Sequence, residues 1–190
     1  MTRITRIIST AAAGMALVIL TGGAGDPVKP EILTMADQKM AVVYTLGDPA
    51  TVAGQAVSAL YGTVYALQGS LKSEGVDLEV GALRARWPDS WNKPKEEWTG
   101  VWGLAIPATV DSIPSVTAGV EVKIETWRYG TVAQILHEGP YEAEPATIQR
   151  LMEFIAKSGY EIAGSHEEEY LTPPGAPDQK TIIRYPVKKK

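Results

Sequence analysis

The chain has 190 residues, a formal net charge of −4 and a hydrophobic content of 45%. This length allows one domain with a real core after a short leader, and the composition indicates neither disorder nor a broad nucleic-acid-binding surface. The absence of cysteine excludes disulfides, thiolate catalysis and thiolate metal sites. Because the only histidines are His137 and His166 and no calcium-loop pattern occurs, we expect no metal and no cofactor.

Residues 1–25 have the pattern of an export signal. Arg3 and Arg6 precede a largely apolar run at 7–20, which is short for a membrane span, and small residues follow it. Residues 20–23, LTGG, are similar to a bacterial lipoprotein processing box with glycine in place of the lipid-bearing cysteine. The alternative is an uncleaved helix that anchors the protein. We expect an extracytoplasmic protein that is secreted, periplasmic or attached to the membrane through this segment alone.

The next residues predict a linker, a strand and a helix. Residues 26–38 contain two prolines and no clear period, which favours a linker, and 39–46 have the composition of a strand. Asp48 is a helix N-cap candidate and Pro49 suits the first helical position. Apolar residues then recur at alternating spacings of four and three, which predicts a helix with one buried stripe that ends at Gly75.

The remaining elements repeat this order. Two strands follow the first helix and are separated by a polar loop that contains tryptophans. After a connector come two more strands, a second helix with Pro145 in its first turn and Gly159 at its end, and two final strands. The predicted ranges are 76–87 and 99–108 with the loop at 88–98, the connector at 109–119, and the later strands at 120–127, 131–137, 160–171 and 180–187.

Strand, helix, strand, strand therefore occurs twice, in halves of about 39–108 and 119–188. Two such modules are expected to pair about a pseudo-twofold axis. We predict an α+β domain at 39–188 whose antiparallel sheets carry helices on one side, with a central cleft at the junction of the halves.

Three glutamates stand in a row in one predicted strand. Alternation along a strand puts His166, Glu168 and Tyr170 on one face and Glu167 and Glu169 on the other. We predict that Glu168 faces the cleft and that its two neighbours are mainly solvated. The alternative is that the whole triplet lies on a solvated strand.

The repeat supports an asymmetric cleft. When Gly81 is aligned with Gly164, Ala85 matches Glu168, so one half supplies a carboxylate where the other supplies a methyl group. A charged, unpaired carboxylate in an apolar cleft costs several kcal/mol, so it raises its pKa or accepts a cation or hydrogen-bond donors. Aromatic faces add about 0.5–2 kcal/mol of attraction for a cation. The pattern favours a flat, lipophilic ligand with a positive or proton-donating group.

Aromatic residues are candidates to line this cleft, each with a packing alternative. Tyr141 could lie over the cleft or fix the start of the second helix. Trp87, Trp91 and Trp98 could form a lid or pin their own loop, and His137 is interpreted as structural. The candidate ligand-binding residues are Glu168, Tyr170, Tyr141, Trp102, Trp127, Tyr61, Tyr65 and His166.

An ordered series of motifs then resembles a known family. The chain has HEGPY at 137–141, TIQRL at 147–151, HEEEYL at 166–171 and KTIIRYPV at 180–187. This series resembles the GyrI-like small-molecule-binding domain superfamily, which includes the effector-binding domains of multidrug-sensing and AraC-type regulators. The resemblance covers about residues 38–188. It implies the duplicated fold, a cleft for drug-like and often cationic molecules, and a key glutamate two residues before a tyrosine, here Glu168.

Two departures from those regulators shape the expected function. No pair of amphipathic helices precedes the domain, so we expect no nucleic-acid partner, and an exported member could not meet gyrase in the cytoplasm. The tryptophan-rich segment 87–102 is also similar to a GyrI-like subgroup that hydrolyses cyclopropane-bearing DNA-alkylating compounds.

Three hypotheses follow for the function. The first is an exported module that captures lipophilic, cationic aromatic compounds next to Glu168. The second is a hydrolase of strained, cyclopropane-bearing electrophiles, in which Glu168 acts as general base or positions a water and Tyr141 or Tyr170 donates a proton. The third is an interaction protein with a vestigial cleft. No G-x-S-x-G nucleophile motif occurs.

Overall fold

Residues 28–190 are described by the structure, which is a computed structural model, and the leader predicted at 1–25 lies outside them. In the described part, neither α-helix is long and apolar enough to cross a membrane. The elements in chain order are β1 (Glu31–Met35), β2 (Gln38–Leu46), α1 (Pro49–Ser73), β3 (Leu83–Trp87), η1 (Lys95–Glu97), β4 (Thr99–Ala105), β5 (Lys123–Trp127), β6 (Gly130–Glu138), η2 (Tyr141–Ala143), α2 (Glu144–Lys157), β7 (Tyr160–Ile162), β8 (His166–Tyr170) and β9 (Lys180–Lys189).

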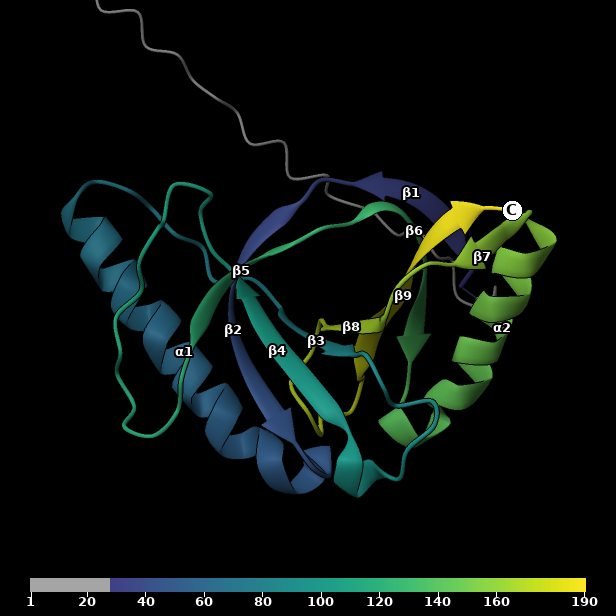
Figure 1. Cartoon of the computed structure of the whole chain (residues 1–190), viewed down its shortest axis with the longest axis horizontal. Helices are drawn as coiled ribbons and strands as arrows, with labels where there is room; N and C mark the ends of the chain where they lie inside the picture. The colour runs from purple at the N-terminus through teal and green to yellow at the C-terminus, as the bar shows by residue number, and fades with distance from the viewer. Residues whose placement is uncertain (1–27) are drawn as a thin grey trace, which may run out of the picture.

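The strands form one curled antiparallel sheet in the order β1-β6-β9-β8-β3-β4-β2-β5, with β7 added beside β9. The first half contributes β2, β4 and β3, the second contributes β8, β9 and β6, and the halves meet where β3 pairs with β8. Figure 1 shows α1 and α2 at opposite ends of the molecule with β3 and β8 between them. The α+β fold with duplicated modules is confirmed.

One row of paired residues crosses the six strands that the two modules contribute. Its members all face the side of the sheet that the helices cover, because α1 packs on its first part and α2 on its last part. Ala85 and Glu168 stand at its centre, where the pseudo-twofold relates β3 to β8. The row runs Val43, Trp102, Ala85, Glu168, Ile183, Ile135.

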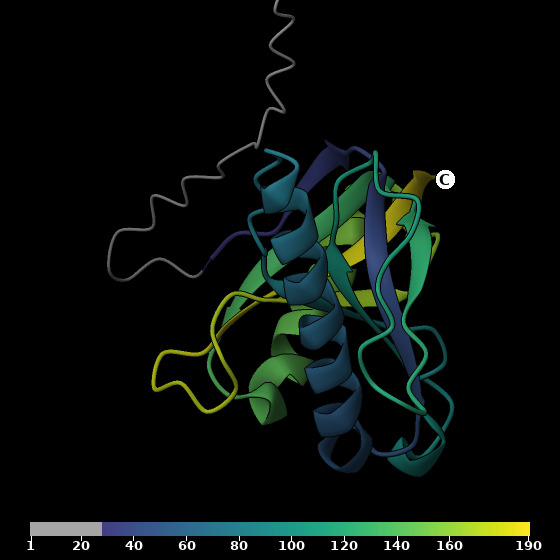
Figure 2. The ribbon, with the colours of Figure 1, turned by 90° about the vertical axis from the view of Figure 1, so that its left-hand side faces the viewer.

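Local signals explain where the first helix begins and ends. The Asp48 side chain accepts a hydrogen bond from the backbone N–H of Ala50 at 3.0 Å, and Pro49 follows as the first helical residue. Gly75 has a φ of +79°, which lets the chain leave the helix. After a turn of 90°, α1 lies in front of the strands and partly hides α2 (Figure 2).

Three predicted elements are corrected by the structure. The linker expected at 26–38 contains β1, which pairs with β6 as an edge strand. The strand expected at 76–87 begins only at Leu83. The alternating apolar residues before Leu83 do not pair with another strand, and one of them, Leu78, is buried in the core beside α1. The strand expected at 160–171 is two strands, interrupted where Gly164 passes so close to Pro186 that a Cβ would lie 2.7 Å from the proline ring.

The opposite face of the sheet holds a buried charge network, which contradicts the expectation that Glu167 and Glu169 are solvated. Glu167 is 1% exposed and accepts hydrogen bonds from Arg86 at 2.7 Å and Arg184 at 2.8 Å. Glu169 accepts from Arg184 at 2.7 Å and from Arg84 at 3.3 Å. The reason is cross-strand pairing, because β3 and β9 place arginines beside these two glutamates.

Candidate functional site

Glu168 lies at the junction of the two halves, on the helix-covered face, and is held by two neighbours from its own strand. Its Oε1 is 2.8 Å from His166 Nε2, and its Oε2 accepts a hydrogen bond from the Tyr170 hydroxyl at 2.5 Å. The other ring nitrogen of His166 is 2.7 Å from the Tyr185 hydroxyl. If that hydroxyl donates to Nδ1, Nε2–H is free to donate to Glu168. The carboxylate side chain is 12% exposed.

Aromatic rings surround this carboxylate. Tyr170 stacks on Trp102 with ring centroids 6.3 Å apart, and Tyr141 meets the Tyr170 ring edge-on at 5.7 Å. Trp91, from the loop between β3 and β4, stacks on Tyr185 at 5.7 Å and meets the His166 ring edge-on. The site is therefore a carboxylate between flat hydrophobic groups contributed by both modules.

The tryptophan loop contacts the site through Trp91 and is tied down through Trp98. Trp98 donates its ring N–H to the backbone carbonyl of Lys93 at 2.9 Å, and its ring packs against Trp87 at 5.8 Å. Trp91 is 50% exposed although it lies over Tyr185. The contacts of Trp98 agree with a loop that is pinned by its own tryptophans, and Trp91 lies beside the His166 and Tyr185 rings.

A second carboxyl group reaches the site and was missed from the sequence. Glu144, the first residue of α2, is 6% exposed, and its Oε1 is buried without a hydrogen-bond partner. Burial and, to a lesser extent, repulsion from Glu168 together raise the pKa of Glu144 to about 8, although a hydrogen bond with Thr181 lowers it. An unpartnered buried polar atom costs about 1–3 kcal/mol. Sequence reasoning could not identify Glu144, because a glutamate in the first turn of a helix is usually solvated and interacts with the helix dipole.

The phenols of the site remain protonated at neutral pH. Burial raises the pKa of Tyr170 well above its usual range, and the charge of Glu168 raises it further. Burial also raises the pKa of Tyr141, with added repulsion from Glu168 and Glu144. Tyr170 therefore keeps the proton that it donates to Glu168, and the protonated Tyr141 hydroxyl is available as a hydrogen-bond donor.

Three candidate residues lie elsewhere. Trp127 is on the opposite face, 2% exposed, where the Arg86 guanidinium stacks 4.1 Å from its ring centroid. Tyr61 and Tyr65 stack on each other along α1, and Tyr65 is 55% exposed. The structure thus brings together Glu168, Tyr170, Tyr141, Trp102 and His166 and leaves Trp127, Tyr61 and Tyr65 outside this cluster.

His137 has a structural environment, as interpreted from the sequence. Its ring nitrogens lie 2.9 Å from the Thr147 hydroxyl and 3.1 Å from the Pro140 carbonyl, and the residue is 4% exposed. These contacts tie the end of β6 to the start of α2. In this way His137 helps to fix the turn that carries Tyr141 and Glu144.

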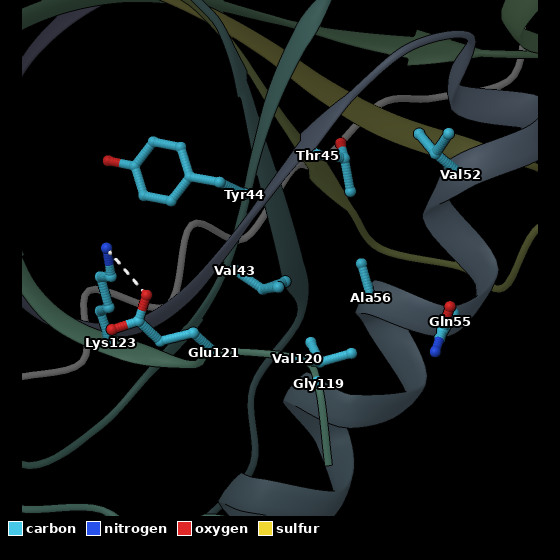
Figure 3. Close-up of a pocket in the computed structure, with 10 residues that line it drawn as sticks. All are labelled: Val43, Tyr44, Thr45, Val52, Gln55, Ala56, Gly119, Val120, Glu121 and Lys123. Atoms are coloured by element: carbon cyan, nitrogen blue, oxygen red, sulfur yellow. Dashed lines mark ion pairs between the residues drawn. The ribbon is translucent and has the colours of Figure 1, made fainter. Parts of the chain in front are cut away.

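Two hollows of the molecule do not include Glu168. One of about 320 Å³ lies between α1 and β2, where Val43 and Ala56 point toward each other and Tyr44 points away (Figure 3). At its edge Glu121 and Lys123 already pair at 3.1 Å. The other, of about 480 Å³, lies on the opposite face and is lined by Arg86, Tyr129 and Ser165, among others. We place the candidate site at Glu168 because buried carboxyl groups and stacked rings converge there.

Solved structures share this fold. An uncharacterized conserved protein from Listeria innocua matches with a TM-score of 0.73 and 24% identity, over 86% of this chain and 94% of that one. A protein from Listeria innocua described as a hydrolase matches with a TM-score of 0.69 and 23% identity, over the same shares. The C-terminal domain of EcmrR matches with a TM-score of 0.54 and 13% identity, over 86% of this chain and 99% of that domain. None of the curated proteins compared with the chain matches it.

The family assignment rests on the sequence as well as the fold. The sequence profile of the GyrI-like small-molecule-binding domain matches residues 28–188, which is most of the chain. The matched segment includes both modules and every residue of the site at Glu168. The chain therefore belongs to the GyrI-like small-molecule-binding domain family.

Proposed function

We propose that this protein is an exported module that captures lipophilic, cationic aromatic compounds at Glu168. One contrast carries the proposal. Glu167 and Glu169 each pair with arginines, whereas within residues 28–190 no lysine or arginine forms an ion pair with Glu168, which has His166 as its neighbour instead. A buried carboxylate without a guanidinium, set among aromatic rings, favours a positive guest.

The test compares two probes that share a naphthalene ring. 1-Naphthylmethyl-trimethylammonium carries a permanent charge and 1-naphthalenemethanol is neutral. For Glu168→Gln we expect the affinity for the cation to fall by about tenfold or more, because one charge is removed, while the affinity for the alcohol changes by less than about threefold. Isothermal titration calorimetry on the full chain measures both.

Glu142→Gln is the matched control, since Glu142 is an exposed glutamate in η2. Removal of its charge is expected to leave both affinities within about twofold, because surface charges act weakly. If Glu168→Gln weakens the cation and the alcohol equally, the carboxylate does not select for charge and the proposal is wrong.

Export is supported by the pattern of residues 1–25, in which two arginines precede an apolar run and small residues. The mature protein is expected to begin after this segment when it is recovered from the extracytoplasmic fraction. N-terminal sequencing of that fraction checks the processing. Recovery of the protein only from the cytoplasm would contradict export, and an intact N-terminus in a membrane fraction would indicate an uncleaved anchor.

Hydrolysis of strained electrophiles is the second candidate. The relay Tyr185–His166–Glu168–Tyr170 orients the carboxylate, which is what a general base needs, and a structural relative is described as a hydrolase. Glu168 would take a proton from a water molecule while the oxygen of that water attacks the cyclopropane carbon. The ring C–C bond would break toward a conjugated carbonyl, and Tyr141 would protonate that oxygen. We place Tyr170 as a positioning donor in this scheme.

Mass spectrometry decides this second candidate. The full chain, in stoichiometric amount, is incubated with a cyclopropane-fused dienone, and the expected product has the mass of the compound plus one water. Glu168→Gln is expected to reduce its formation by about 100-fold or more. An unchanged compound after incubation with the wild-type chain would count against hydrolysis and leave capture intact.

A further inference from the structure

The position of Glu144 gives the site a second, differently placed carboxyl group. It begins α2, directly after η2, and lies near Thr181 of β9, which pairs with Tyr170 in the sheet. Its carboxyl group interacts electrostatically with Glu168, Tyr141 and Tyr170, so all four groups share one environment. Glu144 therefore approaches from the helix side, whereas Glu168 stands on the sheet.

The two carboxyl groups differ in what their oxygens contact. Each oxygen of Glu168 has a partner, His166 for one and the Tyr170 hydroxyl for the other. Glu144 Oε1 has none, and among the buried side-chain atoms without a partner in residues 28–190 it is the one carboxyl oxygen, the others being nitrogens. A hydrogen-bond donor on a ligand could therefore pair with Glu144 Oε1, which has no partner within the protein.

Helix capping does not explain this buried position. A carboxylate near the N-terminus of α2 interacts well with the helix dipole, but exposed Glu142 in the preceding turn could serve that purpose without burial. The cap residue of α2, Ala143, makes no side-chain hydrogen bond, and Glu144 leaves Oε1 unused. The burial of Glu144 next to Glu168 therefore points to a role in the site.

We propose that Glu144 Oε1 accepts an N–H of the ligand and thereby selects protonated amines over permanently charged cations of the same shape. The inference rests on the capture function proposed above and names the class of cation that the site prefers. A quaternary ammonium group neutralises the negative charge of Glu168 but has no N–H to donate, so Glu144 Oε1 remains without a hydrogen-bond partner. A tertiary ammonium group brings one N–H, which forms a charge-assisted hydrogen bond.

Binding of an amine also moves a proton. Burial and the charge of Glu168 raise the pKa of Glu144, so at neutral pH the free site holds a proton there. The other groups that face it are Glu142 and Tyr141 of η2, Tyr170 of β8 and Thr181 of β9. When the ammonium N–H donates to Glu144, the carboxyl proton leaves to solvent. Up to one proton is therefore released per amine bound, and fewer per quaternary ion.

The experiment compares 1-naphthylmethyl-dimethylammonium with its trimethylammonium analogue, which differ by one methyl group in place of the N–H. Isothermal titration calorimetry of the full chain at pH 7, in phosphate and in Tris, gives the affinity and the number of protons released. We expect the wild-type chain to bind the dimethylammonium about tenfold more tightly and to release more protons with it. In Glu144→Leu the preference and the extra proton release are expected to disappear, while the trimethylammonium affinity stays within about threefold.

Glu153→Gln, at an exposed position of α2, is the control and is expected to keep the wild-type preference. Thermal unfolding followed by circular dichroism checks that Glu144→Leu is folded, and Glu144→Gln serves as a second variant. If the wild-type chain binds both cations equally and releases no extra proton, the inference about Glu144 is wrong, although Glu168→Gln can still weaken both. If neither cation binds the wild-type chain, the capture function itself fails.

Discussion

The three consecutive glutamates of β8 show how one strand separates two tasks. Glu167 and Glu169 meet arginines on the face opposite the helices, where burial alone would raise the pKa of Glu169 but Arg84 and Arg184 outweigh it and lower the pKa. Glu168 points to the other face and meets His166 and Tyr170. The partner of each carboxylate, and not the residue type, decides whether it joins the arginine network or contacts His166 and Tyr170 instead.

Glu144 is expected to make stability depend on pH. Its pKa in the folded chain, about 8, lies above the ordinary value of 4.5, so between these values the folded chain binds more protons than the unfolded chain. The free energy of unfolding therefore falls as pH rises from 4.5 toward 8. Urea unfolding at pH 5, 6, 7 and 8 is expected to show a loss of about 1 kcal/mol or more for the wild-type chain.

The matched variant is Glu144→Leu, which removes the titrating group from its buried position. Its free energy of unfolding is expected to be nearly constant from pH 5 to 8 and higher than that of the wild-type chain at pH 8. Both chains are expected to lose stability below pH 4.5, because the lowered pKa of Glu169 contributes stability only above that range. A wild-type profile that is flat from pH 5 to 8 would disprove the raised pKa.

At the scale of elements, local patterns were sufficient for much of the fold. The Asp48–Pro49 start of α1, the Gly75 end and the repeated order of elements could be predicted because each depends on neighbours in sequence. Alternation also predicted that His166, Glu168 and Tyr170 share a face, and their hydrogen bonds agree. These are properties of single strands and helices.

The missed features depend on contacts between elements. The arginines that bury Glu167 lie on β3 and β9, and only the register of those strands on β8 places them there. The position of Glu144 in the site depends on the packing of α2 against β6 and β7, which brings its side chain to Thr181 of β9. A signal existed for the first case, since Arg84 and Arg86 alternate in β3 as the glutamates do in β8, and the repeat already matched Ala85 with Glu168.

Two glycines with different surroundings test the element boundaries. Gly164, between β7 and β8, would place a Cβ 2.7 Å from Pro186 Cγ, whereas exposed Gly54 in α1 has nothing within 4 Å. Gly164→Ala is expected to destabilise the fold by about 1–3 kcal/mol, since the proline ring cannot yield easily. Gly54→Ala is expected to stabilise it by about 1 kcal/mol through helix propensity. Urea denaturation measures both, and equal stability of the two variants would contradict the close approach at Gly164.

At the scale of the whole molecule, the two faces of the sheet hold different groups at the junction of the halves. The helix-covered face carries Glu168 and its rings at the junction of the halves, and the opposite face carries the charge network at the same junction. Arg86 belongs to the first module and Glu167 to the second, so their ion pair joins the modules directly behind the site. The network holds β3, β8 and β9 in the register that positions Glu168.

Loss of the Glu167 carboxylate is therefore expected to weaken the contact between the two modules. Glu167→Gln removes a carboxylate that is 1% exposed and leaves Arg86 and Arg184 without their shared partner, which is expected to lower the free energy of unfolding by about 3–5 kcal/mol. Glu161→Gln is the control, because Glu161 pairs with Lys188 in a solvent-exposed bridge and its loss is expected to cost less than about 1 kcal/mol. Urea denaturation at pH 6 compares them, and similar losses for the two variants would mean that the buried network does not hold the modules together.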